Sequence, residues 1–217
     1  MVINQAIFFY AYKTFLFLWS TRIGMLTASN VWTAVKLSTS AFRNKLCPDN
    51  TIVLFFPDLS YPCKWYLNNK PCPNKSCKFL HKSSSLGYLM NCLNQTIFSI
   101  DVCIFVITSQ DLSEILIKLH KKGVIVRIIT DYEKMDLNNS QIEQFRANGI
   151  QVRHDKTSFL MHHKFAIIDG KTLINGSFNW TNQAITGNQE NLIITNNQLL
   201  IKPFKDQFEK LWIMYKP

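Results

Sequence analysis

The sequence MHHKFAIIDGKTLINGSFNWT, residues 161–181, contains two apolar runs on either side of the dipeptide Asp169-Gly170. An Asp-Gly pair between two runs of apolar and β-branched residues is a strong signal for a two-residue β-hairpin. We therefore predict strands over Met161–Ile168 and Thr172–Ser177.

Strands and helices alternate on both sides of this hairpin. Further strands are expected at Thr51–Phe56, Ser99–Thr108, Val124–Thr130, Ile150–His154 and Asn191–Thr195, and helices at Asp111–Lys122, Ser140–Asn148 and Gln198–Met214. The first two helices begin with capping patterns, Asp111 before Glu114 and Ser140 before Glu143, and a glycine follows each. This order predicts an α/β fold in which helices flank a mixed β-sheet.

The hairpin also carries residues suited to phosphate chemistry. Residues two apart on a strand share a face, so His162 and Lys164 should point one way and His163 the other way. A neutral imidazole can attack phosphorus, and lysine, serine and asparagine can neutralise the charge that develops on the oxygens. The candidate donors are Lys164, Ser177 and Asn179. We expect His163 to be buried or to lie behind the site.

Asp169 completes the string His-x-Lys-x4-Asp but also begins the expected turn. By alternation it faces away from His162, which makes it a residue that shapes the site rather than one that transfers protons. A His-x-Lys pair alone occurs by chance. The full string followed by Gly-Ser-x-Asn is much more specific.

A second motif lies upstream, where Cys63, Cys72, Cys77 and His81 follow one another with eight, four and three residues between them. Three thiolates and one imidazole form a ligand set for tetrahedral zinc. Lysines and aromatic residues lie between the ligands, a composition that suits single-stranded RNA. A finger that only supports the fold would need the same four ligands, so both interpretations stay open.

Positive charge is concentrated in the first part of the chain. Residues 1–92 hold ten Lys/Arg and two acids, whereas residues 93–217 hold fourteen Lys/Arg and twelve acids. Such a surplus attracts polyanions, either nucleic acid or an acidic membrane surface.

Residues 6–19 are apolar apart from Lys13, and basic residues follow the apolar segment. This pattern favours an N-terminal membrane anchor with the bulk of the chain on the cytosolic side. A cleaved targeting segment and an ordinary buried helix are the alternatives, and Lys13 keeps the buried helix open.

The motifs HKFAIIDG, GSFNWT and QENLIIT resemble the HKD signature of the phospholipase D superfamily, and roughly residues 86–215 resemble its Zucchini group, the mitochondrial cardiolipin hydrolases. The resemblance implies that His162 is the nucleophile, with Lys164 and Asp169 as its motif partners. It also implies that Ser177 and Asn179 hold phosphate and that Glu190 orients a histidine. Zucchini-type enzymes are membrane-anchored at the mitochondrial surface, and some contain a CCCH finger.

The resemblance implies two substrates, single-stranded piRNA precursors cut by an endoribonuclease and cardiolipin hydrolysed to phosphatidate. A site of this kind uses two histidines, and the chain has one His-x-Lys string. We therefore expect a homodimer in which two chains share one active site, as in family members with a single motif. A non-catalytic RNA-binding or scaffold protein of the mitochondrial outer membrane is the alternative from another class.

These observations predict four segments: a membrane anchor (1–27), a linker with the first strand (28–56), a CCCH zinc finger (57–82) and a phospholipase D-like catalytic domain (83–217). The expected cofactor is structural zinc, with no catalytic metal. The expected location is the mitochondrial outer membrane, with the catalytic domain facing the cytosol.

Overall fold

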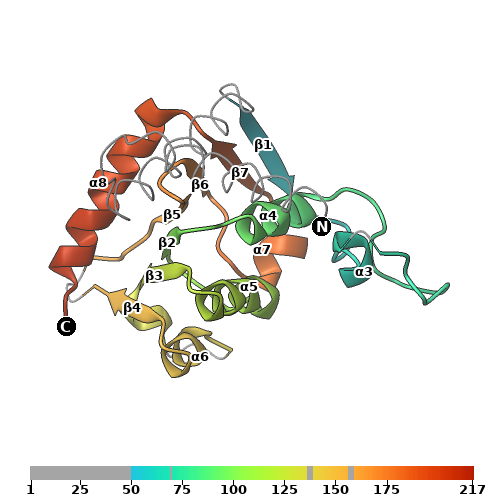
Figure 1. Ribbon diagram of the computed structural model, residues 1–217, viewed down its shortest axis with the longest axis horizontal. Coiled ribbons are helices and arrows are strands. Elements are labelled where there is room, and N and C mark those ends of the chain that lie inside the picture. The colour runs from blue at the N-terminus through green and yellow to red at the C-terminus, as the bar shows by residue number, and fades with distance from the viewer. Residues whose placement is uncertain (1–49, 69, 136–138, 156–158) are drawn as a thin grey trace, which may run out of the picture. The chain divides into compact units, whose positions relative to one another are not determined.

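The computed structural model describes residues 50–217, except residues 69, 136–138 and 156–158 (Figure 1). The expected anchor and most of the expected linker lie outside the described residues. No helix in the described part of the chain is long and apolar enough to cross a membrane.

The described chain forms one seven-stranded sheet with helices on both faces (Figure 1). The strands are β1 (Thr51–Phe56), β2 (Ser99–Ile104), β3 (Ile125–Thr130), β4 (Gln151–His154), β5 (Lys164–Ile168), β6 (Thr172–Gly176) and β7 (Glu190–Thr195). The helices are α3 (Lys64–Leu67), α4 (Ser85–Asn94), α5 (Gln110–Lys121), η1 (Tyr132–Lys134), α6 (Ile142–Ala147), α7 (Asn182–Thr186) and α8 (Gln198–Met214).

The strand order is β1-β7-β6-β5-β2-β3-β4. β2, β3 and β4 are parallel to one another, and every other neighbouring pair is antiparallel. The sheet is mixed and flanked by helices, as predicted. Because β5 is antiparallel to β2, the start of β5 lies at the same edge of the sheet as the ends of β2 and β3.

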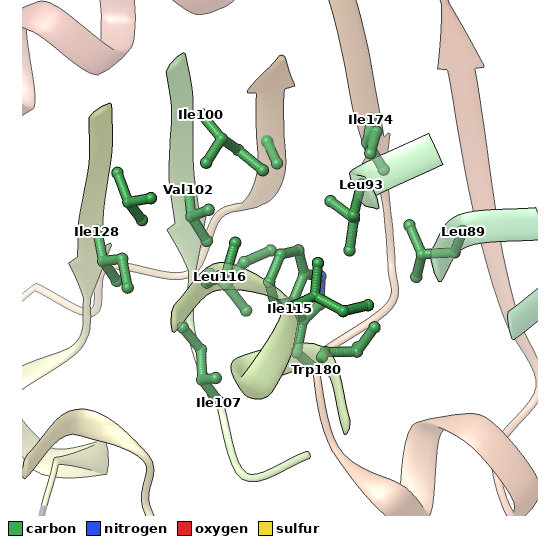
Figure 2. Close-up of a cluster of buried hydrophobic side chains, with 14 of the residues drawn as sticks. Leu89, Leu93, Ile100, Val102, Ile107, Ile115, Leu116, Ile128, Ile174 and Trp180 are labelled. Atoms are coloured by element: carbon green, nitrogen blue, oxygen red, sulfur yellow. The ribbon is translucent and has the colours of Figure 1, made fainter. Parts of the chain in front are cut away.

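Two apolar cores lie on the two faces of the sheet. On one face, Leu89 and Leu93 of α4 and Leu116 of α5 pack with strand residues such as Val102 and with Trp180 (Figure 2). On the other face, α8 covers the second core through Phe208 and its neighbours. Burial of these side chains stabilises the sheet by roughly 1.5–3 kcal/mol for each large residue.

Arg127 of β3 ties α8 to the sheet. Its guanidinium donates to the carboxylates of Asp101, at 2.7 Å, and of Glu209 on α8, at 2.6 Å. The same group lies 4.8 Å from the ring centre of Phe208. Charge pairing and aromatic packing therefore act together between strand and helix.

Two predicted strands, β2 and β5, are shorter than expected by more than one residue. β2 ends at Ile104 instead of Thr108, because the chain then pairs with Trp180, whose carbonyl accepts from the amide of Thr108. β5 begins at Lys164 instead of Met161, because the amide of Met161 donates to the carboxylate of Asp131 at 3.0 Å. Tertiary partners replace the sheet ladder at both places.

Both capping predictions were wrong. The residue at the start of α5 is Ser109, not Asp111, and the residue at the start of α6 is Gln141, not Ser140; neither makes a side-chain cap. The turn prediction is confirmed, since Asp169 and Gly170 have φ angles of 52° and 62°. Positive φ at both central residues is the requirement of a type I′ hairpin.

Candidate active site

The chemically active residues of the hairpin gather at one edge of the sheet. His162 lies two residues before the start of β5, Ser177 directly follows β6, and Glu190 begins β7. Lys164 pairs with Ile104, the last residue of β2. The antiparallel order thus brings residues from distant parts of the sequence to one sheet edge.

His162 and Lys164 are in direct contact. Nζ of Lys164 lies 3.3 Å from Nδ1 of His162 and 2.9 Å from its carbonyl oxygen. Partial burial lowers the pKa of Lys164, and the negative charge of Glu190 opposes that shift. An imidazole beside a charged donor can attack a phosphorus atom whose oxygens the donor holds.

His163 turns away from this pair, as alternation predicted. Its ring packs edge-on against Phe165, with ring centres 5.6 Å apart, and Phe165 belongs to the core under α8. We expected His163 to be buried or to lie behind the site; the residue as a whole is exposed, so burial was wrong and a position behind the site is the alternative that agrees with its contact to Phe165. Contact with Phe165 still removes part of the ring from water, and this desolvation lowers the pKa of His163, with the charges of Lys164 and His162 adding to it.

Ser177 and Glu190 form a second contact at the edge. The Ser177 hydroxyl donates to one Glu190 oxygen, and the side-chain amide of Asn188 donates to the other at 3.0 Å. Both Glu190 oxygens are therefore engaged by residues other than His162. Asn179 lies nearby in sequence with its buried side-chain oxygen unpaired among the described residues.

Gly176 allows β6 and β7 to approach at this point. A Cβ atom there would lie 2.0 Å from the carbonyl oxygen of Asn191. Asn191 in turn accepts from the Ser177 amide and donates its own amide to the Ser177 hydroxyl at 3.1 Å. The absence of a side chain at Gly176 is thus what places Ser177.

Asp169 lies at the opposite end of β5. Its carboxylate accepts from the backbone amides of Ile97, Phe98 and Ser99, with the shortest distance, 2.7 Å, to Phe98. Asp169 follows Lys164 by five positions along the extended strand, a rise of about 16 Å, and it lies farther still from His162. The structure gives Asp169 a role in holding the start of β2, away from the other motif residues.

Three residues at the edge were missed by sequence reasoning. The ring of Phe105, just beyond β2, lies 4.5 Å from the ring of His162, and the ammonium group of Lys134 lies 5.4 Å from the centre of the same Phe105 ring. Asp131, just beyond β3, holds the amide of Met161. Phe105 and Asp131 follow the carboxyl ends of parallel strands, the position where sites form in open α/β sheets, and that was the available signal.

The four predicted metal ligands are together. The ligand atoms of Cys63, Cys72, Cys77 and His81 all lie within 4.8 Å of one another, and the sulfurs of Cys63 and Cys77 are 3.9 Å apart. Tetrahedral zinc with Zn–S bonds of about 2.3 Å separates its sulfurs by about 3.8 Å. The donor set and its spacing fit zinc.

The segment that carries this Cys3His cluster, which we call the finger segment, packs on the rest of the described chain. The Tyr61 hydroxyl donates to Asn182 of α7 at 2.8 Å, and Lys64 lies 3.6 Å from Asp111 of α5. The exposed side chains of this segment include three aromatic residues and three lysines: Trp65, Tyr66, Phe79, Lys70, Lys75 and Lys78. The finger segment starts directly after β1, whose last residue, Phe56, pairs with Glu190.

Known proteins match most of this chain in sequence. Residues 89–212 match the family described as "Cardiolipin synthase, PLD-like domain". A protein of Chlamydomonas reinhardtii named "Mitochondrial cardiolipin hydrolase" is 47% identical over 165 residues, which cover 75% of this chain and 73% of that protein. The mouse protein of the same name is 42% identical over 173 residues, or 76% of each chain.

Solved structures agree in fold. The phospholipase D family member Nuc from Salmonella typhimurium superposes with a TM-score of 0.62 at 22% identity, covering 78% of this chain and 97% of that one. NucT from Helicobacter pylori superposes with a TM-score of 0.60 at 21% identity, covering 77% and 98%. The chain therefore belongs to the phospholipase D superfamily, as a hydrolytic enzyme in the group whose members are named mitochondrial cardiolipin hydrolase.

Proposed function

We propose that this protein hydrolyses cardiolipin to phosphatidate at the mitochondrial outer membrane, with His162 as the nucleophile. The observation that carries the proposal is the contact between His162 and Lys164, which joins a nucleophile to a phosphate-binding cation. The name shared by the relatives supports cardiolipin as the lipid.

The reaction proceeds in two displacements. A nitrogen of His162 attacks one phosphorus of cardiolipin, and the bond from that phosphorus to the bridging glycerol oxygen breaks. Phosphatidylglycerol leaves with a proton, and the phosphatidyl group stays on His162. Water then attacks the phosphohistidine, loses a proton to a base and releases phosphatidate. Lys164, Ser177 and Asn179 hold the phosphate oxygens during both steps.

A second imidazole supplies the proton for the leaving oxygen. His163 faces the core under α8, and His154 packs against Tyr132 with ring centres 5.1 Å apart. We assign the acid to His162 of a second chain in a symmetric homodimer with one shared site. The exposed position of His162, at the end of a strand, supports this assignment.

The test is hydrolysis of cardiolipin liposomes by the purified full-length chain. His162→Ala should lower kcat by at least about 1,000-fold, since it removes the nucleophile. His163→Ala is the matched control and should keep most of the activity. Acid-quenched wild-type protein should yield a phosphatidyl adduct on the peptide that contains His162. Full turnover by a folded His162→Ala protein would refute the proposal.

Single-stranded RNA is the second candidate substrate. The exposed aromatic residues of the finger segment, Trp65, Tyr66 and Phe79, can stack with bases, and the lysines beside them can pair with phosphates. In this second proposal the protein is an endoribonuclease of piRNA precursors. Cleavage of a labelled 30-nucleotide RNA, compared with cardiolipin hydrolysis in the same preparation, decides between the two. A protein that binds RNA and cuts neither substrate would instead fit the non-catalytic scaffold.

The proposed membrane location of the protein depends on residues 1–27, which lie outside the described residues. We propose that they anchor the chain in the mitochondrial outer membrane with the catalytic domain in the cytosol. Protease treatment of intact mitochondria should remove the catalytic domain, and deletion of residues 1–27 should release the protein from the membrane fraction.

A further inference from the structure

The turn that follows β3 is fixed to the segment that carries His162. Asp131 is buried, and one of its oxygens accepts from the amide of Met161 at 3.0 Å while the other accepts from Glu133 at 3.1 Å. Asp155, also buried, accepts from the amide of Tyr132 at 2.7 Å. The turn and the residue next to His162 are therefore joined through one buried carboxylate, that of Asp131, and the carboxylate of Asp155 holds the turn as well.

This turn places a second cation beside the proposed site. The ammonium groups of Lys134 and Lys164 lie 5.4 Å and 5.1 Å from the centre of the Phe105 ring. The ring of His162 packs against the same ring at 4.5 Å. Because both distances are measured from one centre, the two ammonium groups are separated by no more than the sum of those distances.

Lys134 forms no strong ion pair with the described residues. Its described acidic partner is the neighbouring Glu133, at 3.6 Å, and the Glu133 side chain is 68% exposed. An ion pair with one solvent-exposed partner is weak. A phosphate can displace such a carboxylate, while the stem of Lys134 keeps its contact with Phe105.

We infer that Lys134 binds the second phosphate of cardiolipin while Lys164 binds the phosphate that is cleaved. This inference rests on the proposed function. Six bonds separate the two phosphorus atoms of cardiolipin, which is a span of roughly 7.6 Å, twice the three-bond distance between consecutive Cα atoms. That span is shorter than the largest separation that the shared Phe105 contact allows between the ammonium groups of Lys134 and Lys164. Phosphatidylglycerol, with one phosphate on the same glycerol, lacks the group that Lys134 recognises.

The experiment compares the two lipids as substrates of the full-length protein in mixed micelles. Lys134→Met removes the charge and keeps an apolar stem against Phe105, and Lys134→Arg restores the charge. For Lys134→Met, the ratio of kcat/KM for cardiolipin to that for phosphatidylglycerol should fall about tenfold, equivalent to about 1.4 kcal/mol. The loss should appear in KM for cardiolipin, and Lys134→Arg should restore most of the ratio.

Lys118→Met is the matched control, because Lys118 also pairs with a nearby acid, Glu114 at 3.2 Å, but lies on α5. It should leave the ratio unchanged. An equal loss on both lipids, an unchanged ratio in Lys134→Met, or an effect confined to RNA cleavage would overturn the inference.

A binding measurement separates failure of the inference from failure of the proposed function. Co-sedimentation with vesicles of cardiolipin or of phosphatidylglycerol should show that Lys134→Met loses the preference for cardiolipin. If the wild-type protein hydrolyses neither lipid, the proposed function is refuted. In that case the vesicle binding alone tests the role of Lys134. A preference for cardiolipin vesicles that the wild-type protein has and Lys134→Met lacks supports the inference. An equal preference in the two proteins overturns the inference.

Discussion

The ammonium group of Lys164 contacts both the ring and the backbone of His162, at 3.3 Å to Nδ1 and 2.9 Å to the carbonyl oxygen. These contacts fix the imidazole and the cation as one unit. A phosphate oxygen bound by Lys164 is therefore within reach of the ring, which is the geometry that a phosphohistidine step requires.

The charge of Glu190 predicts a shift in pH dependence. Burial lowers the pKa of Lys164, and Glu190 raises it in opposition. Glu190→Gln removes the opposing effect, so Lys164 should lose its proton at a lower pH than in the wild-type protein. The alkaline limb of the kcat/KM profile should move to lower pH, and Glu143→Gln on the exposed face of α6 should leave it in place. A limb that moves to higher pH would contradict this account.

Asp169 should matter for stability more than for turnover. Asp169→Ala leaves three backbone amides without their acceptor at the start of β2 and places alanine at positive φ. The free energy of unfolding, measured with urea, should fall by about 2–3 kcal/mol. Asp169→Asn keeps one acceptor oxygen and tolerates positive φ, so its loss should be smaller.

In both Asp169 variants the folded fraction should retain kcat/KM within a few-fold. A collapse of kcat/KM at wild-type stability would instead place Asp169 in the chemistry, as the family signature implies.

Elemental analysis should find about one zinc per chain in reducing buffer. Cys72→Ser and His81→Ala should lose the metal, because each removes a ligand of the cluster. Cys92→Ser should keep it. Burial raises the pKa of Cys92 to about 11, so that thiol stays protonated and is a poor ligand.

Chelation tests whether that zinc is structural. It should lower the melting temperature, because the finger segment packs on α7 through Tyr61 and Asn182. Hydrolysis of a small phosphodiester should continue wherever the fold survives. If protein purified without zinc has unchanged stability, the metal is not structural.

Mixing experiments test the shared site. Excess His162→Ala chains, co-folded with wild-type chains, place most wild-type chains in mixed dimers that hold one histidine. Activity per wild-type chain should then fall steeply as mutant is added, because the acid is missing. Constant activity per wild-type chain, with mixed dimers demonstrated by differently tagged subunits, would mean that each chain carries a complete site.

Sequence reasoning succeeded where the determining contacts are local. The Asp169-Gly170 turn and the shared face of His162 and Lys164 depend on a few neighbouring residues. The true start of β5 could not be read in this way, because the amide of Met161, where the strand was predicted to begin, is held by Asp131, thirty residues earlier. The cap at Ser140 failed for a related reason: its hydroxyl is buried and makes no cap in the described chain.

The cluster around Phe105 shows the same limit within the site. Phe105, Lys134 and His162 come from three segments that meet only when β2, β3 and β5 are side by side. The local pattern shows only that Phe105 follows a strand, and no single segment indicates that these three side chains come into contact. The candidate metal ligands Cys63, Cys72, Cys77 and His81 were predictable because three cysteines and a histidine close together in the sequence form a ligand set for zinc.

The close approach of the β7 backbone to Gly176 predicts how mutations at this codon behave. Every missense change of a glycine codon introduces a Cβ atom, and at this position that atom would meet the backbone of β7 at 2.0 Å. The obstacle is main chain, so a second-site change in a side chain cannot relieve it. A saturation library at this codon, selected for activity, should return glycine alone, and missense alleles here should behave as recessive nulls that lack intragenic suppressors.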